Sequence, residues 1–183
     1  TVTFTAGSSS AKTFTVTPTV GGTLTLTPTT SNSLLTNPSA LNYTVNEVAS
    51  GYTLTGPSSG NVNVASTNFT ITANGPVASN TTFTITYGGS AKGSLTTQTV
   101  TLSTGSTTGT FTVTPTVIGT LTLTATNSGS LSDPSALNYS SNGSYTLTGP
   151  SSGNVNAAST NFTLTPSAVV GDTTTVTITY GGS

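Results

Sequence analysis

The chain has 183 residues, only 3% of them charged, and a formal net charge of −1, whereas ordinary soluble domains contain about 25% charged residues. Lys12 and Lys92 are its only cationic side chains, so it has almost nothing with which to bind a nucleic-acid backbone or an anionic membrane surface. No apolar run approaches the ~20 residues of a membrane-spanning helix. We therefore expect no nucleic-acid partner and no insertion into a membrane.

The composition favours β-strands over disorder. Disordered chains combine a high net charge with few β-branched residues, whereas this chain is nearly neutral and rich in Thr and Val. β-Branched residues fit the pleated surface of a sheet. The chain has no Cys, so neither a disulfide framework nor a thiolate metal site is available.

The strands are predicted from runs in which apolar residues alternate with Thr, such as Phe69 and Ile71 or Phe83 and Ile85. This period of two is typical of strands with one packed and one wet face. Turn-forming stretches recur about every eight to twelve residues, as in an antiparallel sandwich or barrel. In chain order, strands are expected at about 52–56, 67–73, 81–87, 96–103, 109–114, 120–126 and 136–140. We expect no helix.

Most of the sequence occurs twice. GYTLTGPSSGNVNVASTNFTIT begins at Gly51, and SYTLTGPSSGNVNAASTNFTLT begins at Ser144, a spacing of 93 residues. Further upstream, TFTVTPTVGGTLTLT begins at Thr13 and TFTVTPTVIGTLTLT begins at Thr110, a spacing of 97 residues. NPSALNY and DPSALNY recur in the same way. The whole chain is therefore made of one repeat of about 95 residues.

The repeat divides the chain into a complete copy and two halves. The complete copy spans residues 44–139, residues 1–43 repeat its second half, and residues 140–183 repeat its first half. A half on its own would leave an apolar face and unpaired strand edges in water. We therefore expect a neighbouring copy, or the rest of a longer chain, to complete each half.

The aromatic residues indicate which positions pack in the core. All six Tyr residues fall into the matched pairs Tyr43/Tyr139, Tyr52/Tyr145 and Tyr87/Tyr180. The Phe residues give the pairs Phe14/Phe111 and Phe69/Phe162, while Phe4 corresponds to Leu102 and Phe83 to Val176. The copies thus preserve apolar volume, as a packed core requires.

Side chains suited to catalysis are scarce. There is no His to activate a Ser or Thr nucleophile. Paired carboxylates would have to come from Glu47, Asp133 and Asp172, but Glu47 lies in an inserted segment and the two Asp residues become Asn37 and Ser79 in the other copy. These carboxylates are also too scattered for a Ca²⁺ site. We expect no enzyme activity, no cofactor and no metal.

Asn-X-Ser/Thr sequences provide candidate glycosylation acceptors at Asn42, Asn68, Asn80, Asn138, Asn142 and Asn161. Two pairs recur in both copies, Asn42 with Asn138 and Asn68 with Asn161. Covalent glycans on a secreted chain would supply the solubility that charges do not. The alternative is that these Asn residues are unmodified strand or turn residues.

The order YTLTGPSSG, NVNVASTNFTIT, TVTLSTGSTTGTFTVTPTVIGTLTLTATNSG and LSDPSALNY resembles the bacterial immunoglobulin-like repeats that lie in tandem along large surface and adhesin-type proteins. The resemblance covers the whole chain and implies an all-β fold of immunoglobulin-like antiparallel β-sandwich repeats in tandem. Such repeats usually act as stalk or filament segments. In this chain the phase is shifted, because family members are normally delimited at complete domains.

These observations lead us to expect a non-enzymatic, extracellular structural protein of a cell surface or surface appendage. Its partners would be copies of itself, end to end, either in one covalent array or by strand and half-domain complementation between molecules. An adhesin or carbohydrate-binding repeat, or a viral or phage fibre or decoration protein, is the alternative.

Overall fold

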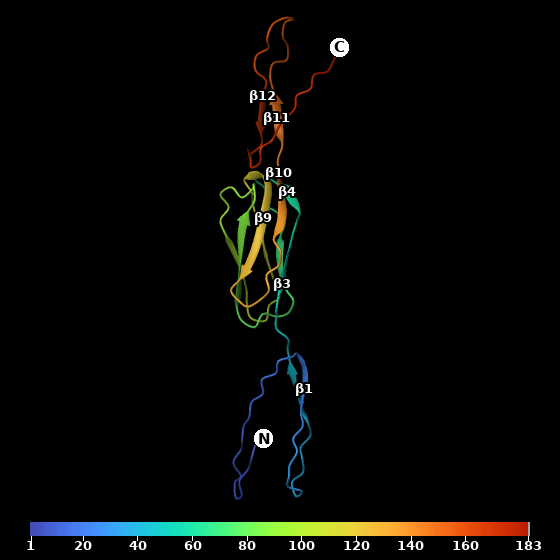
Figure 1. Ribbon diagram of the computed structural model, residues 1–183, viewed down its shortest axis with the longest axis vertical. Coiled ribbons are helices and arrows are strands. Elements are labelled where there is room, and N and C mark those ends of the chain that lie inside the picture. Colours follow the sequence, from blue (N-terminus) through green and yellow to red (C-terminus); the bar gives the residue numbers. More distant parts are fainter. Residues whose placement is uncertain (183) are drawn as a thin grey trace. The chain divides into compact units, whose positions relative to one another are not determined.

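The computed structural model describes residues 1–182, which form strands, turns and irregular segments and no helix (Figure 1). The chain divides into two compact units, Thr1–Glu47 and Val48 onward. The strands are β1 (Gly22–Leu26), β2 (Leu41–Val45), β3 (Tyr52–Thr55), β4 (Ser59–Asn61), β5 (Phe69–Ala73), β6 (Thr81–Gly88), β7 (Gln98–Leu102), β8 (Thr108–Phe111), β9 (Val117–Asn127), β10 (Leu137–Asn142), β11 (Tyr145–Thr148), β12 (Thr163–Pro166) and β13 (Val169–Val170).

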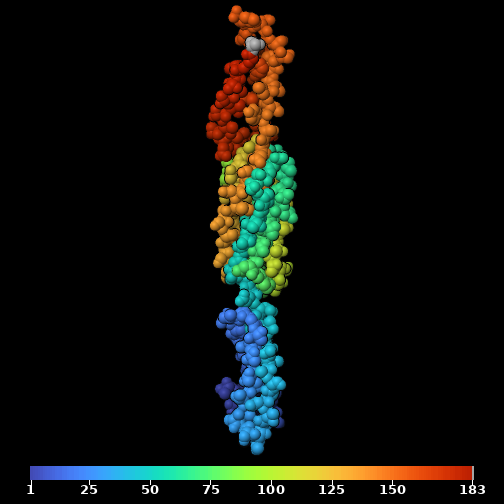
Figure 2. Space-filling view, turned by 90° about the vertical axis from the view of Figure 1, so that its right-hand side faces the viewer, coloured from blue at the N-terminus to red at the C-terminus, as the bar shows by residue number. Residues whose placement is uncertain are grey.

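Residues 48–142, here called the central region, hold two sheets around one core. One sheet has the order β3-β5-β8, and the other contains β4-β10-β9-β6-β7. The core takes Phe69 and Ile71 from the first sheet and Phe83, Ile85 and Leu121 from the second. Two sheets that enclose a common apolar layer are consistent with a β-sandwich. The space-filling view shows this region as a continuous packed surface (Figure 2).

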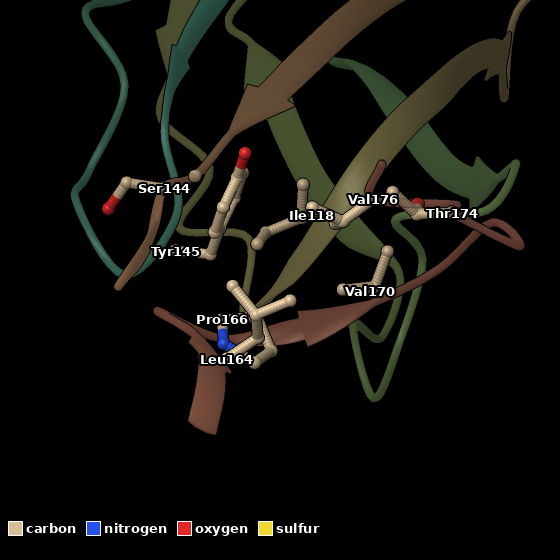
Figure 3. Close-up of a pocket in the computed structure, with 9 residues that line it drawn as sticks. Ile118, Ser144, Tyr145, Leu164, Pro166, Val170, Thr174 and Val176 are labelled. Carbon is tan, nitrogen blue, oxygen red and sulfur yellow. The ribbon is translucent and has the colours of Figure 1, made fainter. Parts of the chain in front are cut away.

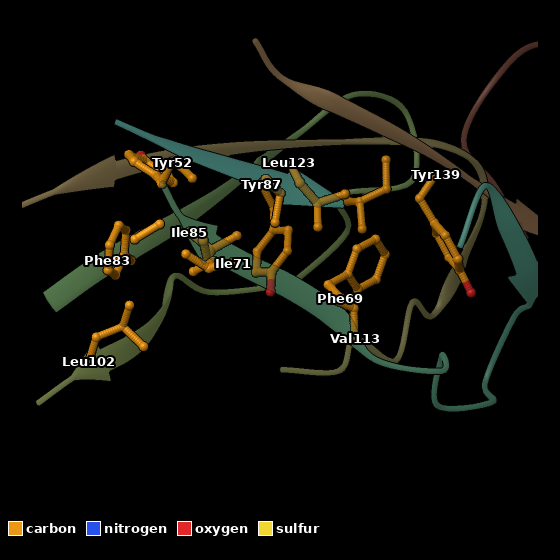
Figure 4. Close-up of a cluster of buried hydrophobic side chains, with 14 of the residues drawn as sticks. Tyr52, Phe69, Ile71, Phe83, Ile85, Tyr87, Leu102, Val113, Leu123 and Tyr139 are labelled. Atoms are coloured by element: carbon orange, nitrogen blue, oxygen red, sulfur yellow. The ribbon is translucent and has the colours of Figure 1, made fainter. Parts of the chain in front are cut away.

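The core follows directly from the alternating sequence. In β6 the pattern TTFTITYG places Phe83, Ile85 and Tyr87 on one face, where they are buried, while Thr84 and Thr86 lie on the other. Tyr52, Phe83 and Leu102 lie together at one end of the core, and Phe69, Val113 and Tyr139 lie at the other (Figure 4). Alternation of this kind fixes which face of each strand turns inward.

The seven strands predicted for the complete copy are confirmed as β3, β5, β6, β7, β8, β9 and β10. The three-residue strand β4 was not predicted, because its sequence SGN has the composition of a turn. It pairs in parallel with β10, with Gly60 beside Ser141. A Cβ atom at Gly60 would meet the hydroxyl of Tyr139, so this pairing depends on glycine.

A second parallel pair joins Val169 and Val170 of β13 to Val117 and Ile118 of β9. The other strand pairs are antiparallel, as predicted. The two parallel pairs use strands of two or three residues, which a pattern of period two is too short to reveal.

In the unit Thr1–Glu47, β1 and β2 form a two-stranded antiparallel sheet that pairs Leu24 with Tyr43. The segment after the central region, residues 143–182, contains the two-stranded antiparallel sheet of β11 and β12 and the short strand β13. We call these two parts the N-terminal segment (residues 1–47) and the C-terminal segment (residues 143–182).

Candidate functional site

The N-terminal and C-terminal segments expose apolar side chains whose counterparts in the sequence repeat are buried in the central region. Phe162 is 59% exposed and Phe69 is 0% exposed. Tyr43 is 51% exposed and Tyr139 is 0% exposed. The same contrast separates Tyr145 from Tyr52, Leu147 from Leu54, and Leu164 from Ile71. Complete burial of a large apolar side chain contributes about 1.5–3 kcal/mol, and each of these partly exposed side chains forgoes a part of it.

Both exposed segments nevertheless keep the strand register of the central region. The matching pairs are Tyr145 opposite Pro166 with Tyr52 opposite Ala73, and Leu24 opposite Tyr43 with Leu121 opposite Tyr139. A side-chain hydrogen bond also recurs, from Thr25 to Asn42 at 2.9 Å and from Thr122 to Asn138 at 3.0 Å. The apolar faces of the segments are therefore already arranged as they are inside the central core.

Unusual backbone conformations recur at matched positions as well. Asn63 and Asn156 have φ angles of 62° and 59°, in the left-handed region that non-glycine residues seldom occupy. Gly7 and Gly105 have φ angles of 80° and 83°. The local sequence thus sets these turns without the remainder of a sandwich around them.

Several expected strands are absent from the segments for a physical reason. In the central region β6 lies between β7 and β9. Its counterpart, residues 174–181, carries no strand, and neither do residues 1–4 and 11–14, the counterparts of β7 and β8. A strand requires a neighbour for its backbone N–H and C=O groups. These three stretches have the alternating sequence of strands but lack that neighbour.

The open face of the C-terminal segment contains a cavity of about 320 Å³. It is lined by Ile118, Gly143, Ser144, Tyr145, Leu164, Pro166, Val170, Thr174 and Val176. Figure 3 shows Tyr145, Ile118, Leu164 and Val170 gathered around it. The lining is mainly apolar, and six of its members correspond to the buried residues Tyr52, Ile71, Ala73, Val77, Thr81 and Phe83. The lining of the cavity therefore repeats residues that the central region buries in its core.

A hydrogen-bonded cluster closes one end of the central core. The Tyr52 hydroxyl and the Asn127 amide both donate to Oδ1 of Asp133, each at 2.7 Å. Burial, together with the contact to Asp133, raises the pKa of Tyr52 above its ordinary value. In the N-terminal segment Asn37, the counterpart of Asp133, accepts the backbone N–H of Thr30 at 2.9 Å. Asp133 and Asn37 both use a side-chain oxygen as a hydrogen-bond acceptor. The alignment of the two copies shows this shared acceptor, so it could have identified the position.

The other predicted Asp joins the C-terminal segment to the central region. Ser90 donates to Oδ2 of Asp172 at 2.6 Å and accepts the N–H of Thr120 at 3.0 Å. Beside it, the N–H of Gly171 donates to the Ile118 carbonyl at 2.8 Å. Asp133 and Asp172 are both exposed, and each carboxylate accepts a hydrogen bond from a residue about eighty positions away in the sequence.

Two further tyrosines are buried in the central region. The Tyr87 hydroxyl donates to Gln98 at 2.6 Å, and burial raises its pKa to about 12. Burial also raises the pKa of Tyr139, whose hydroxyl finds no hydrogen-bond partner among residues 1–182. The counterpart of Tyr87 is Tyr180, which is almost fully exposed.

The candidate glycosylation acceptors lie at the surface: Asn42, Asn68, Asn80, Asn138, Asn142 and Asn161 are all exposed. Three of them already use their side-chain oxygen as an acceptor, Asn42 and Asn138 from Thr25 and Thr122, and Asn80 from the N–H of Thr104 at 3.0 Å. Glycosylation occurs on the amide nitrogen, which these hydrogen bonds leave available.

Within residues 1–182, no three His, Cys, Asp or Glu side chains gather as a metal site would require, and no helix is long and apolar enough to cross a membrane. Glu47, the third carboxylate, lies in the other compact unit from Asp133 and Asp172. Comparison with protein-family models and with curated proteins gives no match to this chain.

Proposed function

We propose that this chain is a non-enzymatic structural protein outside the cell, forming a filament or stalk at a cell surface or in a surface appendage. Its building unit is a β-sandwich of the immunoglobulin-like class, repeated in tandem. Support comes from the two sheets of short strands that enclose one core and from the repeat of about 95 residues, close to the ~100 residues of such domains.

The observation that carries the proposal is that the two segments supply complementary sets of strands. The C-terminal segment contains counterparts of β3 to β6, and the N-terminal segment contains counterparts of β7 to β10. Each exposes the apolar face that its counterpart buries. One C-terminal segment and one N-terminal segment therefore hold every strand of a second sandwich.

The union is head to tail. It joins two different surfaces of the chain, so it does not close on itself and continues from one unit to the next. Added strands gain backbone hydrogen bonds along their whole length, and alternate side chains enter the partner's core. Polymer length is then the product of the repeated sequence. Covalent glycans at the exposed Asn acceptors would keep this weakly charged surface hydrated.

The experiment is electron microscopy of the purified chain over a range of concentrations, combined with mass spectrometry of the denatured sample. We expect fibres that dissolve into units of 18.0 kDa plus any glycans. Native fibres that yield a much heavier polypeptide would place the same sandwiches in one covalent array. A chain that stays monomeric and forms no fibres at high concentration would contradict the proposal.

A further inference from the structure

The cavity in the C-terminal segment corresponds to a filled part of the central core. Phe83, the counterpart of Val176, is fully buried there and contacts Tyr52 edge to face, with 4.7 Å between ring centroids. Leu102 belongs to the same core cluster and is 2% exposed. In Figure 4 these three side chains lie together. Any segment that completes the cavity must therefore place an apolar side chain at the position that Leu102 occupies in the central region.

The strand register identifies that position. In the pairing of β6 with β7, Thr81 lies opposite Leu102. The counterpart of Thr81 is Thr174, which lines the cavity, and the counterpart of Leu102 is Phe4. Phe4 is 61% exposed in the free chain. A strand of residues 1–4 placed beside residues 174–177 with the register of β6 and β7 sets Phe4 opposite Thr174, at the cavity.

The side-chain sizes change in opposite directions at the two matched positions. Phe83 becomes the smaller Val176, and Leu102 becomes the larger Phe4. Adjacent large-to-small and small-to-large changes conserve the volume of a core, whereas either change alone leaves a void or overfills it. Leu102 lies opposite Thr81, two residues before Phe83 in β6, so Leu102 and Phe83 are on the same face of the sheet. Such diagonal neighbours on adjacent strands come within reach of an aromatic ring.

Building on the proposed function, we propose that Phe4 of a second copy fills the cavity beside Val176, and that the reversed sizes make this junction selective. A C-terminal segment would then accept an N-terminal segment in preference to β7 and Leu102 of a central region. Likewise, an N-terminal segment would not replace β7 beside β6 of the central region, because Phe4 in place of Leu102 would overfill the space next to Phe83. The size pair thus directs each half to its intended partner and leaves complete sandwiches intact.

The test uses Phe4→Leu, Val176→Phe and the double variant, with association measured by sedimentation and light scattering over a concentration series. Each single substitution is expected to weaken association by about 5- to 150-fold, equivalent to the roughly 1–3 kcal/mol that a cavity or an overpacked contact costs. The double variant recreates the pair found in the central region and is expected to return to within a few-fold of the original chain. Val64→Ala is the matched control, because Val64 and its counterpart Ala157 are both exposed.

The free chain tolerates these substitutions because neither position lies in the central core, and thermal unfolding of the central region checks this. Association that is unchanged by the single substitutions, or a double variant as weak as the two losses combined, would overturn the pairing and leave the proposed filament standing. An original chain that remains an 18.0 kDa monomer at every concentration would overturn both.

Discussion

Removal of the phenyl ring from Phe69 should strongly destabilise the free chain, whereas its removal from the matched residue Phe162 should hardly change the stability. Phe69 is completely buried, stacks on Phe111 with 5.3 Å between ring centroids, and meets Tyr139 edge to face at 5.6 Å. Truncating a core Phe to Ala costs about 3–5 kcal/mol, and aromatic pairs add about 0.5–1.5 kcal/mol each to burial. Because the measured cost of truncation already includes such contacts, we expect Phe69→Ala to lie in the upper part of that range and to lower the free energy of unfolding by about 4–5 kcal/mol.

Phe162→Ala removes the same ring from a side chain that is already 59% exposed. It lies outside the central core, so the free energy of unfolding of the central region should change by less than about 0.5 kcal/mol, as for ordinary surface substitutions. Urea unfolding of dilute samples, followed by circular dichroism, measures both variants. Similar losses at the two positions would refute the reasoning, because they would mean that Phe162 is packed in the free chain.

Assembly should reverse this result for Phe162. In a completed sandwich it would meet the counterparts of Phe111 and Tyr139, namely Phe14 and Tyr43 of the next copy. Phe162→Ala should then weaken association by about 3 kcal/mol or more, more than 100-fold in the dissociation constant. A substitution that leaves the stability of the monomer unchanged but strongly weakens association is the result expected if Phe162 becomes buried only on assembly.

Gly60→Ala should destabilise the central region by about 1–3 kcal/mol, because its Cβ would meet Tyr139, whereas Gly153→Ala at the matched position has open space and should be tolerated in the monomer; equal unfolding midpoints for the two variants would contradict this. The pH dependence follows from the three buried tyrosines Tyr52, Tyr87 and Tyr139, because burial raises the pKa of each, that of Tyr87 to about 12. Stability should hold below pH 10 and then fall as the pH rises toward 12, because the unfolded chain ionises first. A urea midpoint that is constant across that interval would contradict the second prediction, and Tyr87→Phe should make the decline smaller.

The sequence predicted the central sheets well because their alternation is strong and local. Phe83, Ile85 and Tyr87 each fall on the packed face that a period of two requires. The short strand Ser59–Asn61 could not be predicted from the sequence. Its pairing depends on the space that Gly60 leaves for Tyr139 and not on any pattern within the strand.

The candidate site was predicted in outline and missed in detail. Comparing the copies identified the two halves and even the substitution of Phe4 for Leu102. It could not show that Val176 borders a cavity, because a cavity depends on which wall is missing in three dimensions. The hydrogen bonds of Asp133 and Asp172 were missed because their partners, Tyr52 and Ser90, lie about eighty residues away along the chain.

The absence of Cys makes the central claim directly testable by cross-linking. In the central region Thr82 lies opposite Thr101, and their hydroxyl oxygens are 3.0 Å apart. Their counterparts are Thr175 and Thr3. Directly opposite residues of an antiparallel pair have Cβ atoms about 4.5–5.5 Å apart, close to the roughly 3.5–4.5 Å that a disulfide spans, so a small strand movement would let a disulfide form.

The decisive measurement mixes a Thr3→Cys chain with a separate Thr175→Cys chain under mild oxidation and weighs the denatured products. Half-domain exchange between molecules predicts a disulfide-linked dimer, at twice 18.0 kDa, that dominates in the mixture and not with either chain alone. Thr3→Cys mixed with Val64→Cys, an exposed position outside the junction, sets the background. A yield from the Thr3 and Thr175 pair that does not exceed this background would contradict the account.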